Sequence, residues 1–216
     1  MVAFTPSLSA LLAALPFLLG LARAEVAATD DLSTNSTLTW EQQYGVVDAP
    51  EFAIFPSDGS SRKKYVRAPP GAFQGPQSGI GSWFRANSKS DSTTGKSWCG
   101  YKYSDSTPGF APDISQMTEW TNAVYPNAKW SKYASMYCGR EAQVTDPQTG
   151  KTSLLFITDA FDHQWVRSPG SIDIHLNAWR KLKNSQTNDK NTVIKPVNWH
   201  LTGRISAQYA FKGKGG

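Results

Sequence analysis

Two aspartates, Asp159 and Asp173, are the residues of this chain whose type and position best suit chemistry. Each closes an apolar run, at residues 154–157 and 171–172 respectively. Because a buried, unpaired charge is costly, a carboxylate at the end of a strand suits a site better than a core. Inverting hydrolysis of a glycoside requires two carboxylates about 6.5–9.5 Å apart, one of them with a raised pKa. Both aspartates are therefore candidate catalytic or ligand-binding groups.

Other carboxylates and a structural alternative keep this interpretation open. Asp162 could join the pair, and Asp113 is an outside candidate. An aspartate at a strand end can instead cap a helix, and Asp173 precedes a predicted helix. His163 lies in a polar loop where it could contact a ligand, whereas His175 is expected on a helix surface. The spacing of the histidines is not typical of a metal cluster, so the sequence predicts neither a metal nor a cofactor.

Aromatic side chains offer a second way to hold a sugar, because the C–H groups of a sugar ring stack on aromatic faces. Trp165 lies in a polar loop and is expected to be exposed. Tyr101 and Tyr103 alternate along the chain and are expected to share one face. Large rings are also the main apolar material of a small core. For Trp179 and Trp199 we expect that structural role.

Short strands, small helices and glycine-rich turns must position these candidates. Residues 142–157 predict a β-hairpin, since Asp, Pro and Gly at its centre each favour a bend. Residues 171–184 predict a strand end followed by a short helix, and residues 192–201 predict a half-buried strand. A helix is expected to begin near Asp113, and residues 129–137 are expected to form a connector. Together these elements predict a small barrel.

The two ends of the chain differ from its centre. Residues 1–24 predict a secretory signal peptide, because an apolar run ends in a small-x-small cleavage pattern. That run is short for a bilayer span, and no later stretch predicts one. Residues 25–78 predict a largely irregular segment and linker, with a glycosylation sequon at Asn35. The barrel is expected over residues 79–203, with a tail over 204–216. We therefore expect a secreted, extracellular protein.

The net charge of the chain limits the class of partner, and its cysteine content predicts a disulfide. The formal net charge is +5, and loss of the leader with Arg23 would leave +4. A mildly basic secreted protein favours anionic surfaces such as acidic polysaccharide, although the charge could equally serve solubility alone. No arginine-rich stripe indicates a nucleic-acid partner. Cys99 and Cys138 are the only cysteines, and in an oxidising compartment they predict one disulfide.

The order and spacing of several motifs resemble a known barrel family. The motifs are Cys99-Gly100, Cys138-Gly139, Thr149-Gly150-Lys151-Thr152, Ile157-Thr158-Asp159, Ser171-Ile172-Asp173-Ile174 and Ile194-Lys195-Pro196-Val197-Asn198-Trp199. They look like a double-psi β-barrel, the group that includes barwin, the N-terminal domain of expansins, the rare lipoprotein A barrel and related endoglucanases. The resemblance implies an all-β, six-stranded double-psi β-barrel with one or two short helices. The leader, the sequon and the tail would fit a secreted fungal member.

The resemblance also implies roles for individual residues. Asp173 matches the groove aspartate that serves as general acid in the endoglucanases, and Asp159 matches a groove residue of the rare-lipoprotein-type barrels. The endoglucanases carry their base on the first strand after an aromatic pair, where this chain has Arg85. The lytic transglycosylase version uses a histidine in the middle segment, and residues 113–125 contain none. The resemblance therefore implies a sugar groove without the hydrolytic pair.

The leading hypothesis is a secreted expansin-like or barwin-like protein that binds cell-wall polysaccharide of the cellulose, chitin or peptidoglycan type without hydrolysis. Asp159 and Asp173 would hydrogen-bond sugar hydroxyls. The rings of Trp165, Tyr101 and Tyr103 would stack on the sugar. One alternative is a weak endoglucanase or lytic glycosidase that uses Asp173, which a second carboxylate across the groove would favour. The other is a protein-binding module, such as a protease inhibitor or an effector, which an exposed apolar patch without a groove would favour.

Overall fold

The computed structural model of the 216-residue chain describes residues 38–49, 52–54, 64–66, 72–121, 123–124, 128–211 and 213. The predicted signal peptide and the sequon at Asn35 lie outside the described residues. None of the helices within the described ranges is long and apolar enough to cross a membrane.

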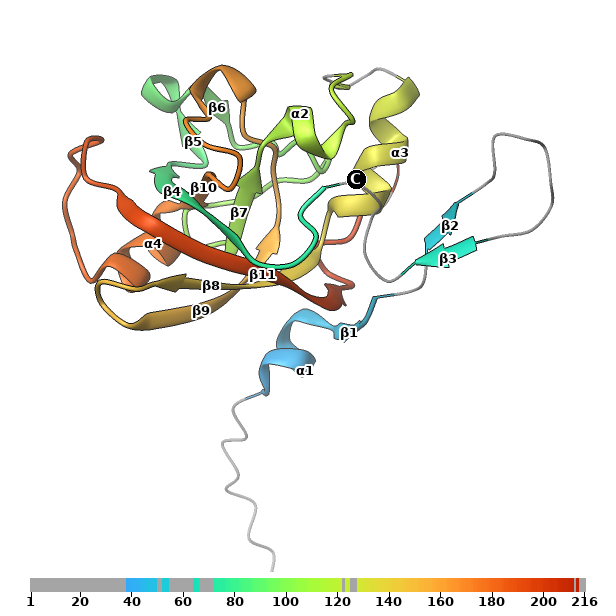
Figure 1. Cartoon of the computed structure of the whole chain (residues 1–216), viewed down its shortest axis with the longest axis horizontal. Coiled ribbons are helices and arrows are strands. Elements are labelled where there is room, and N and C mark those ends of the chain that lie inside the picture. Colours follow the sequence, from blue (N-terminus) through green and yellow to red (C-terminus); the bar gives the residue numbers. More distant parts are fainter. Residues whose placement is uncertain are drawn as a thin grey trace, which may run out of the picture. The chain divides into compact units, whose positions relative to one another are not determined.

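Six strands close into a barrel (Figure 1). They are β4 (Gln77–Phe84), β7 (Gly109–Pro112), β8 (Arg140–Asp146), β9 (Lys151–Ile157), β10 (Ile172–His175) and β11 (Ile194–Ser206). Around the barrel the order is β11–β4–β10–β7–β9–β8, and β8 pairs with β11 to close it. The β4–β10 and β7–β9 pairs are parallel, whereas the other pairs are antiparallel. This closed barrel of mixed strand direction fits the all-β, six-stranded double-psi β-barrel that the sequence predicted.

The predicted hairpin is confirmed as β8 and β9. The two strands pair antiparallel, with Asp146 opposite Lys151 at the turn. The turn takes a left-handed backbone at Gly150 (φ 69°), a conformation that glycine adopts without steric cost. Ala142 and Val144 point into the barrel and are fully buried. From Ala142 to Asp146, buried positions on β8 alternate with more exposed ones, as in a strand with one face in the core.

Large rings fill the barrel interior. Trp179 and Trp199 are buried, as predicted. Their indole N–H groups donate to the carbonyl oxygens of Gly81 (3.1 Å) and Gly170 (2.9 Å). At Gly79 the backbone of β4 passes so close to Gly170 that a Cβ on Gly79 would overlap the Gly170 backbone. Glycine at this crossing lets the chain just before β10 lie directly against β4.

The expectation of a connector over residues 129–137 is wrong, because α3 (Ala128–Tyr137) occupies it. Trp130, Tyr133, Ala134 and Tyr137 are buried, and their spacing of three and four residues is that of one helical face. Immediately after α3, Cys138 forms the predicted disulfide with Cys99.

Two further helices flank the strands of the barrel. The short helix α2 (Ile114–Met117) begins where predicted, with the Asp113 side chain accepting from the Ser115 amide. Helix α4 (Leu176–Lys183) follows β10 directly. The predicted strand end and short helix of residues 171–184 are therefore confirmed.

Part of the segment that was predicted to be largely irregular forms regular elements. These are α1 (Trp40–Tyr44), β1 (Val46–Asp48), β2 (Phe52–Ile54) and β3 (Lys64–Val66). A capping box between Thr39 and Gln42 begins α1. β1 then pairs antiparallel with β11, beyond residue 203, where the barrel was expected to end. Trp40 stacks on Phe156 of β9, with ring centroids 5.1 Å apart, so α1 packs on the outside of the barrel.

Candidate functional site

A groove of about 770 Å³ lies where β4 and β10 end. One wall is formed by the 3₁₀ helix η1 (Lys89–Asp91) and the short strand β6 (Thr93–Thr94), which pairs with β5 (Asn87–Ser88). The opposite wall comes from residues 159–165, which include the 3₁₀ helix η2 (His163–Trp165). Figure 1 shows β5 and β6 beside the ends of β4 and β10. The groove therefore lies between two walls at the ends of two parallel strands.

Asp173 lies in this groove because of the pleat of β10. Its neighbours Ile172 and Ile174 are fully buried, so the Asp173 side chain points to the other face of the strand. Ser82 is its register partner on β4 and donates a 2.9 Å hydrogen bond to Asp173 Oδ1. Burial raises the pKa of Asp173 to about 7, against the opposing effect of the Ser82 hydroxyl. The alternative that Asp173 caps α4 is wrong, because His175 occupies the N-cap position.

Asp159 also lines the groove, but its oxygens are already engaged. Oδ1 accepts from the amides of Trp98 (2.7 Å) and Ala160 (2.9 Å), and Oδ2 accepts from the Tyr103 hydroxyl at 2.7 Å. Burial raises the pKa of Asp159 in spite of these three donors. Asp159 therefore ties the loop after β9 to the Trp98–Tyr103 segment while it lines the groove with Asp173.

The sequence analysis missed one of the groove carboxylates, Asp91. It pairs with Lys190 at 2.8 Å and accepts from Arg85 through both the backbone N–H and Nε, each at 3.0 Å. Burial would raise the pKa of Asp91, but the hydrogen bonds from Lys190 and the Arg85 amide hold it below its ordinary value. The Lys190 ammonium also lies 3.8 Å from the centroid of the Trp83 ring. The signal available in the sequence was local, since Arg85 and Asp91 lie only six residues apart.

Of the three aromatic residues predicted to contact a sugar, two line the groove. Trp165 lines the groove and is 59 % exposed, as expected. Tyr103 lines it as well. Tyr101 does not: its ring packs near Tyr209, with centroids 5.9 Å apart, and its hydroxyl is buried. The expectation that Tyr101 and Tyr103 share one face is therefore not met.

His163 lies outside the groove. Its Nδ1 is 2.9 Å from Asp113 Oδ2, and its ring makes an edge contact with the exposed ring of Trp120. Asp113, the outside candidate, is buried and caps α2, so its role here is structural. Asp162 does line the groove, where it caps η2 through the Gln164 amide.

The expectation that His175 lies on a helix surface is wrong, because His175 is the last residue of β10 and is fully buried. Its Nε2 lies 3.1 Å from the Thr158 hydroxyl, and its ring packs between Phe84 and Tyr103. Burial lowers the pKa of His175 to about 3, so the ring is neutral near pH 7. His175 supports the groove from beneath by packing against Tyr103.

The donor set of the groove consists of carboxylates, lysines and hydroxyls. Among the residues that the structure describes, no three His, Cys, Asp or Glu side chains cluster as metal ligands would. With two carboxyls of raised pKa, an exposed indole ring, a half-buried phenol ring and several hydroxyls, the groove can exchange hydrogen bonds with a polyhydroxylated ligand.

Comparison with known proteins gives matches of structure only. No protein-family model matches the chain, and no curated protein matches it. Among solved structures, it is similar to a mutant expansin of Clavibacter michiganensis in complex with cellohexaose, with 16% identity and a TM-score of 0.37. The apo form of the expansin from the same organism matches with 18% identity and a TM-score of 0.37. Each match covers 59% of this chain and 50% of the expansin chain, so this chain is similar to about half the length of these expansins.

Proposed function

We propose that the chain acts outside the cell and binds cell-wall polysaccharide of the cellulose, chitin or peptidoglycan type in the groove, without hydrolysing it. The support comes from the state of the four carboxylates that line the groove, of which Asp162 is engaged by Gln164. Asp173 is available to a ligand, whereas Asp159 and Asp91 are occupied by partners within the chain.

Asp173 is suited to sugar hydroxyls, because each hydroxyl both donates and accepts. Among the described residues, the donor to the Asp173 carboxyl is the Ser82 hydroxyl, which bonds to Oδ1. With a pKa of about 7, the carboxyl exists in both protonation states near neutral pH. A protonated carboxyl donates one hydrogen bond, and an ionised one only accepts. Asp173 can therefore match a sugar hydroxyl in either orientation.

The proposal that the groove does not hydrolyse its ligand is supported mainly by Asp91, which is bonded to other residues of the chain. An inverting glycosidase needs a second carboxylate that is free to take a proton from water. Asp91 is held by Lys190 and Arg85, and its lowered pKa makes it a weak base. Asp159 accepts three hydrogen bonds and has no comparable freedom. Asp162 accepts from the backbone and side-chain nitrogens of Gln164, at 3.1 and 2.6 Å, so each groove carboxylate other than Asp173 is engaged by several donors within the chain.

A pull-down on insoluble cellulose, chitin and peptidoglycan, with released sugars assayed in the same tubes, tests this proposal. The wild-type protein should bind at least one of these polymers and release no sugar. Asp173→Ala should lose that binding, and Asp48→Ala, which removes an exposed carboxylate on β1, should keep it. If Asp173→Ala bound like the wild type, the groove assignment would be wrong.

A weak glycosidase is the second candidate, and the raised pKa of Asp173 favours it. A general acid works best when its pKa lies near the operating pH, and that of Asp173 is about 7. The base would be Asp91 after separation from Lys190, or Asp162 after separation from Gln164. Sugar release that both Asp173→Asn and Asp91→Asn abolish would establish this candidate in place of simple binding.

A further inference from the structure

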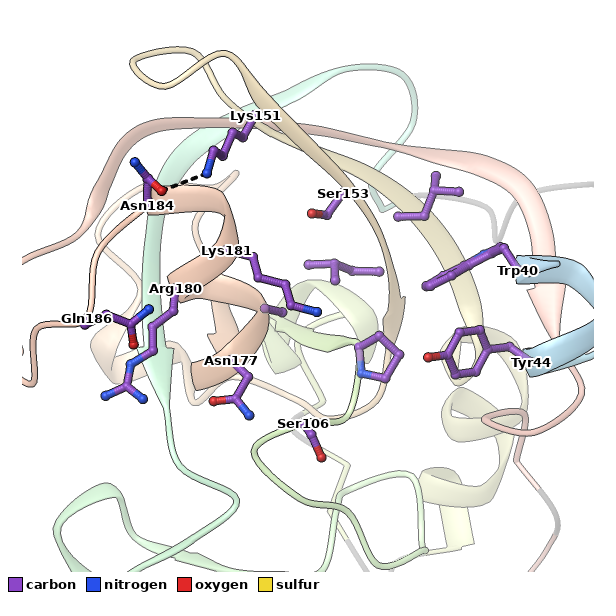
Figure 2. A pocket seen from close by; sticks show the side chains of 14 residues that line it. Trp40, Tyr44, Ser106, Lys151, Ser153, Asn177, Arg180, Lys181, Asn184 and Gln186 are labelled. Atoms are coloured by element: carbon purple, nitrogen blue, oxygen red, sulfur yellow. Dashed lines mark hydrogen bonds between the residues drawn. The ribbon is translucent and has the colours of Figure 1, made fainter. Parts of the chain in front are cut away.

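A second pocket, of about 750 Å³, lies between α4, β9 and α1 (Figure 2). It shares no lining residue with the groove. Its floor is apolar, formed by Leu154 and Leu155 of β9 and by Pro108. Helix α4 forms one wall, and the rings of Trp40 and Tyr44 from α1 form the wall opposite. The pocket is therefore completed by the N-terminal segment that precedes the barrel.

The charge of this pocket is opposite to that of the groove. Lys151, Arg180 and Lys181 line it, and no carboxylate does. Lys151 donates to the neutral Asn184 at 2.8 Å, and Arg180 donates to the neutral Asn188 at 2.9 Å. In the described part of the chain, Arg180 Nε is buried without a hydrogen-bond partner. The three cations thus line one pocket whose lining provides no counter-ion.

The carboxylates of the α1 region do not neutralise these cations. Glu141 accepts two hydrogen bonds from Arg204, at 2.9 and 3.0 Å, and one from the Trp40 indole at 2.8 Å. Glu41 pairs with the same Arg204 at 2.9 Å. Lys181 makes no ion pair or hydrogen bond within the described ranges, and Figure 2 shows its ammonium extending into the pocket. An anionic ligand would supply the charge that this wall lacks.

The opposite wall is an ordered aromatic surface. Trp40 stacks on Phe156 with an interplanar angle of 12°, and the hydrogen bond to Glu141 fixes its rotation. Tyr44 contacts Trp40 edge-on, with centroids 4.4 Å apart. Figure 2 shows Trp40 and Tyr44 across the pocket from Lys181. An apolar ring surface facing an ammonium group suits a ligand with a flat C–H face on one side and a negative charge on the other.

We propose that this pocket binds a uronic acid unit of an anionic polysaccharide. The sugar ring packs on the wall of Trp40 and Tyr44, while the ring carboxylate pairs with Lys181, and the positive charge of Lys151 and Arg180 favours the same anion. The groove, with Asp91, Asp159, Asp162 and Asp173 in its lining, suits a ligand without carboxylates. The protein thus has two saccharide sites of different charge preference, and the second does not depend on the groove function.

Calorimetric titration of the secreted protein with a short oligogalacturonate, and with the uncharged galactose oligomer as comparator, tests the site. The wild type should bind the oligogalacturonate and not the comparator. Lys181→Gln should raise the dissociation constant about tenfold, the loss expected for one charge-assisted hydrogen bond. Lys195→Gln, which removes the same charge from an exposed position on β11, should change it by less than about twofold, since distant exposed charges are screened by salt.

Several outcomes would overturn the proposal. They are no binding of the oligogalacturonate, equal binding of the uncharged oligomer, and equal weakening by the two lysine variants, which would indicate general electrostatic attraction. Displacement by inorganic phosphate at matched ionic strength would mark a plain anion site. Asp173→Ala should leave oligogalacturonate affinity unchanged, so that failure of the groove proposal and failure of this one can be told apart. A loss of affinity in Asp173→Ala would show that the uronate occupies the groove instead.

Discussion

Ser82 and Asp173 are direct register partners in the parallel β4–β10 pair, and the Ser82 hydroxyl donates to the Asp173 carboxyl at 2.9 Å. Two adjacent strands thus present a donor and an acid side by side at the groove. The hydrogen bond favours the ionised carboxylate, yet burial outweighs it and raises the pKa to about 7. Because Asp173 changes its protonation state near neutral pH, both ligand binding and the stability of the fold should depend on pH.

The first prediction concerns stability as a function of pH in Asp173→Asn. The folded wild type retains a proton on Asp173 up to about pH 7, whereas in the unfolded chain the pKa is near 3.8. The wild type therefore loses stability as the pH rises from about 3.8 through about 7, and the asparagine variant lacks this loss. The difference between these pKa values corresponds to at most about 4 kcal/mol in the free energy of unfolding.

Urea denaturation of both proteins between pH 4 and pH 8 measures this effect. The variant should gain stability relative to wild type as the pH rises, and Asp48→Asn, at an exposed site, should show no such trend. A constant difference between wild type and Asp173→Asn across that range would mean that the carboxyl of Asp173 has an ordinary pKa.

The second prediction concerns the acid side of the stability curve and His175. Because burial lowers the pKa of His175 to about 3, the unfolded chain takes up a proton below about pH 6.5 that the folded chain does not. The stability that neutral His175 contributes is therefore lost as the pH falls from about 6.5 towards 3. His175→Gln can keep a hydrogen bond to Thr158 and should flatten this limb. Thermal unfolding from pH 7 to pH 3 tests it, with the exposed His200→Gln as control, and an unchanged slope in His175→Gln would contradict it.

Local patterns in the sequence were sufficient for most of the barrel. The β8–β9 hairpin follows from turn residues between alternating strands, and the disulfide follows from there being only two cysteines. Asp173 was found because it ends an apolar run. These features depend on residues close together in the chain or on a count, so one sequence is enough to predict them.

The sequence-based predictions were wrong or incomplete where a residue contacts a distant part of the chain or lies at the boundary between two elements. His175 is the last residue of β10 and immediately precedes α4, so neither the strand period nor the helix period assigns its face. The pairing of Asp91 with Arg85 is local and could have been found, but its contact with Lys190, in a loop between α4 and β11, is not local. Tyr101 and Tyr103 alternate as in a strand, but the segment has no regular strand to keep them on one face.

A third prediction separates ligand contact from general surface aromaticity. Trp165 is 59 % exposed in the groove, and Trp120 is 67 % exposed outside it. Trp165→Ala should weaken polysaccharide binding about two- to tenfold, the range expected for loss of one ring contact. Trp120→Ala should bind as the wild type does. Depletion assays on the polymer that the wild type binds measure both, and equal losses in the two variants would show that stacking is not specific to the groove.

The disulfide gives a fourth prediction. Cys99 and Cys138 close a loop with a sequence separation of 39, which joins the groove-side segment before Tyr101 to the end of α3. In the chain-entropy model a loop of this length contributes about 4 kcal/mol. The double variant Cys99→Ala/Cys138→Ala should lose stability of that order in urea denaturation without reductant. Reductant should destabilise the wild type and leave the variant unaffected; a loss below about 1 kcal/mol would mean that packing alone holds this junction.

The last prediction addresses the ion pair that keeps Asp91 from acting as a base. Lys190 is partly exposed at its side chain, whereas Asp91 is almost fully buried, so the pair is more than a surface contact. Lys190→Gln should lower the free energy of unfolding by about 1–2 kcal/mol, because Asp91 keeps its bonds to Arg85 but loses its nearest charge. Lys195→Gln, a matched change at an exposed position, should leave stability unchanged.

The same variant also distinguishes binding from hydrolysis. Without Lys190, the pKa of Asp91 should rise towards its ordinary value, because a lysine hydrogen bond and its charge hold it down. If the groove only binds sugar, Lys190→Gln releases no sugar from any polymer, since Asp91 remains hydrogen-bonded to Arg85. Sugar release that appears in Lys190→Gln and disappears again in Lys190→Gln/Asp173→Asn would show instead that the ion pair suppresses an acid–base pair that is otherwise competent.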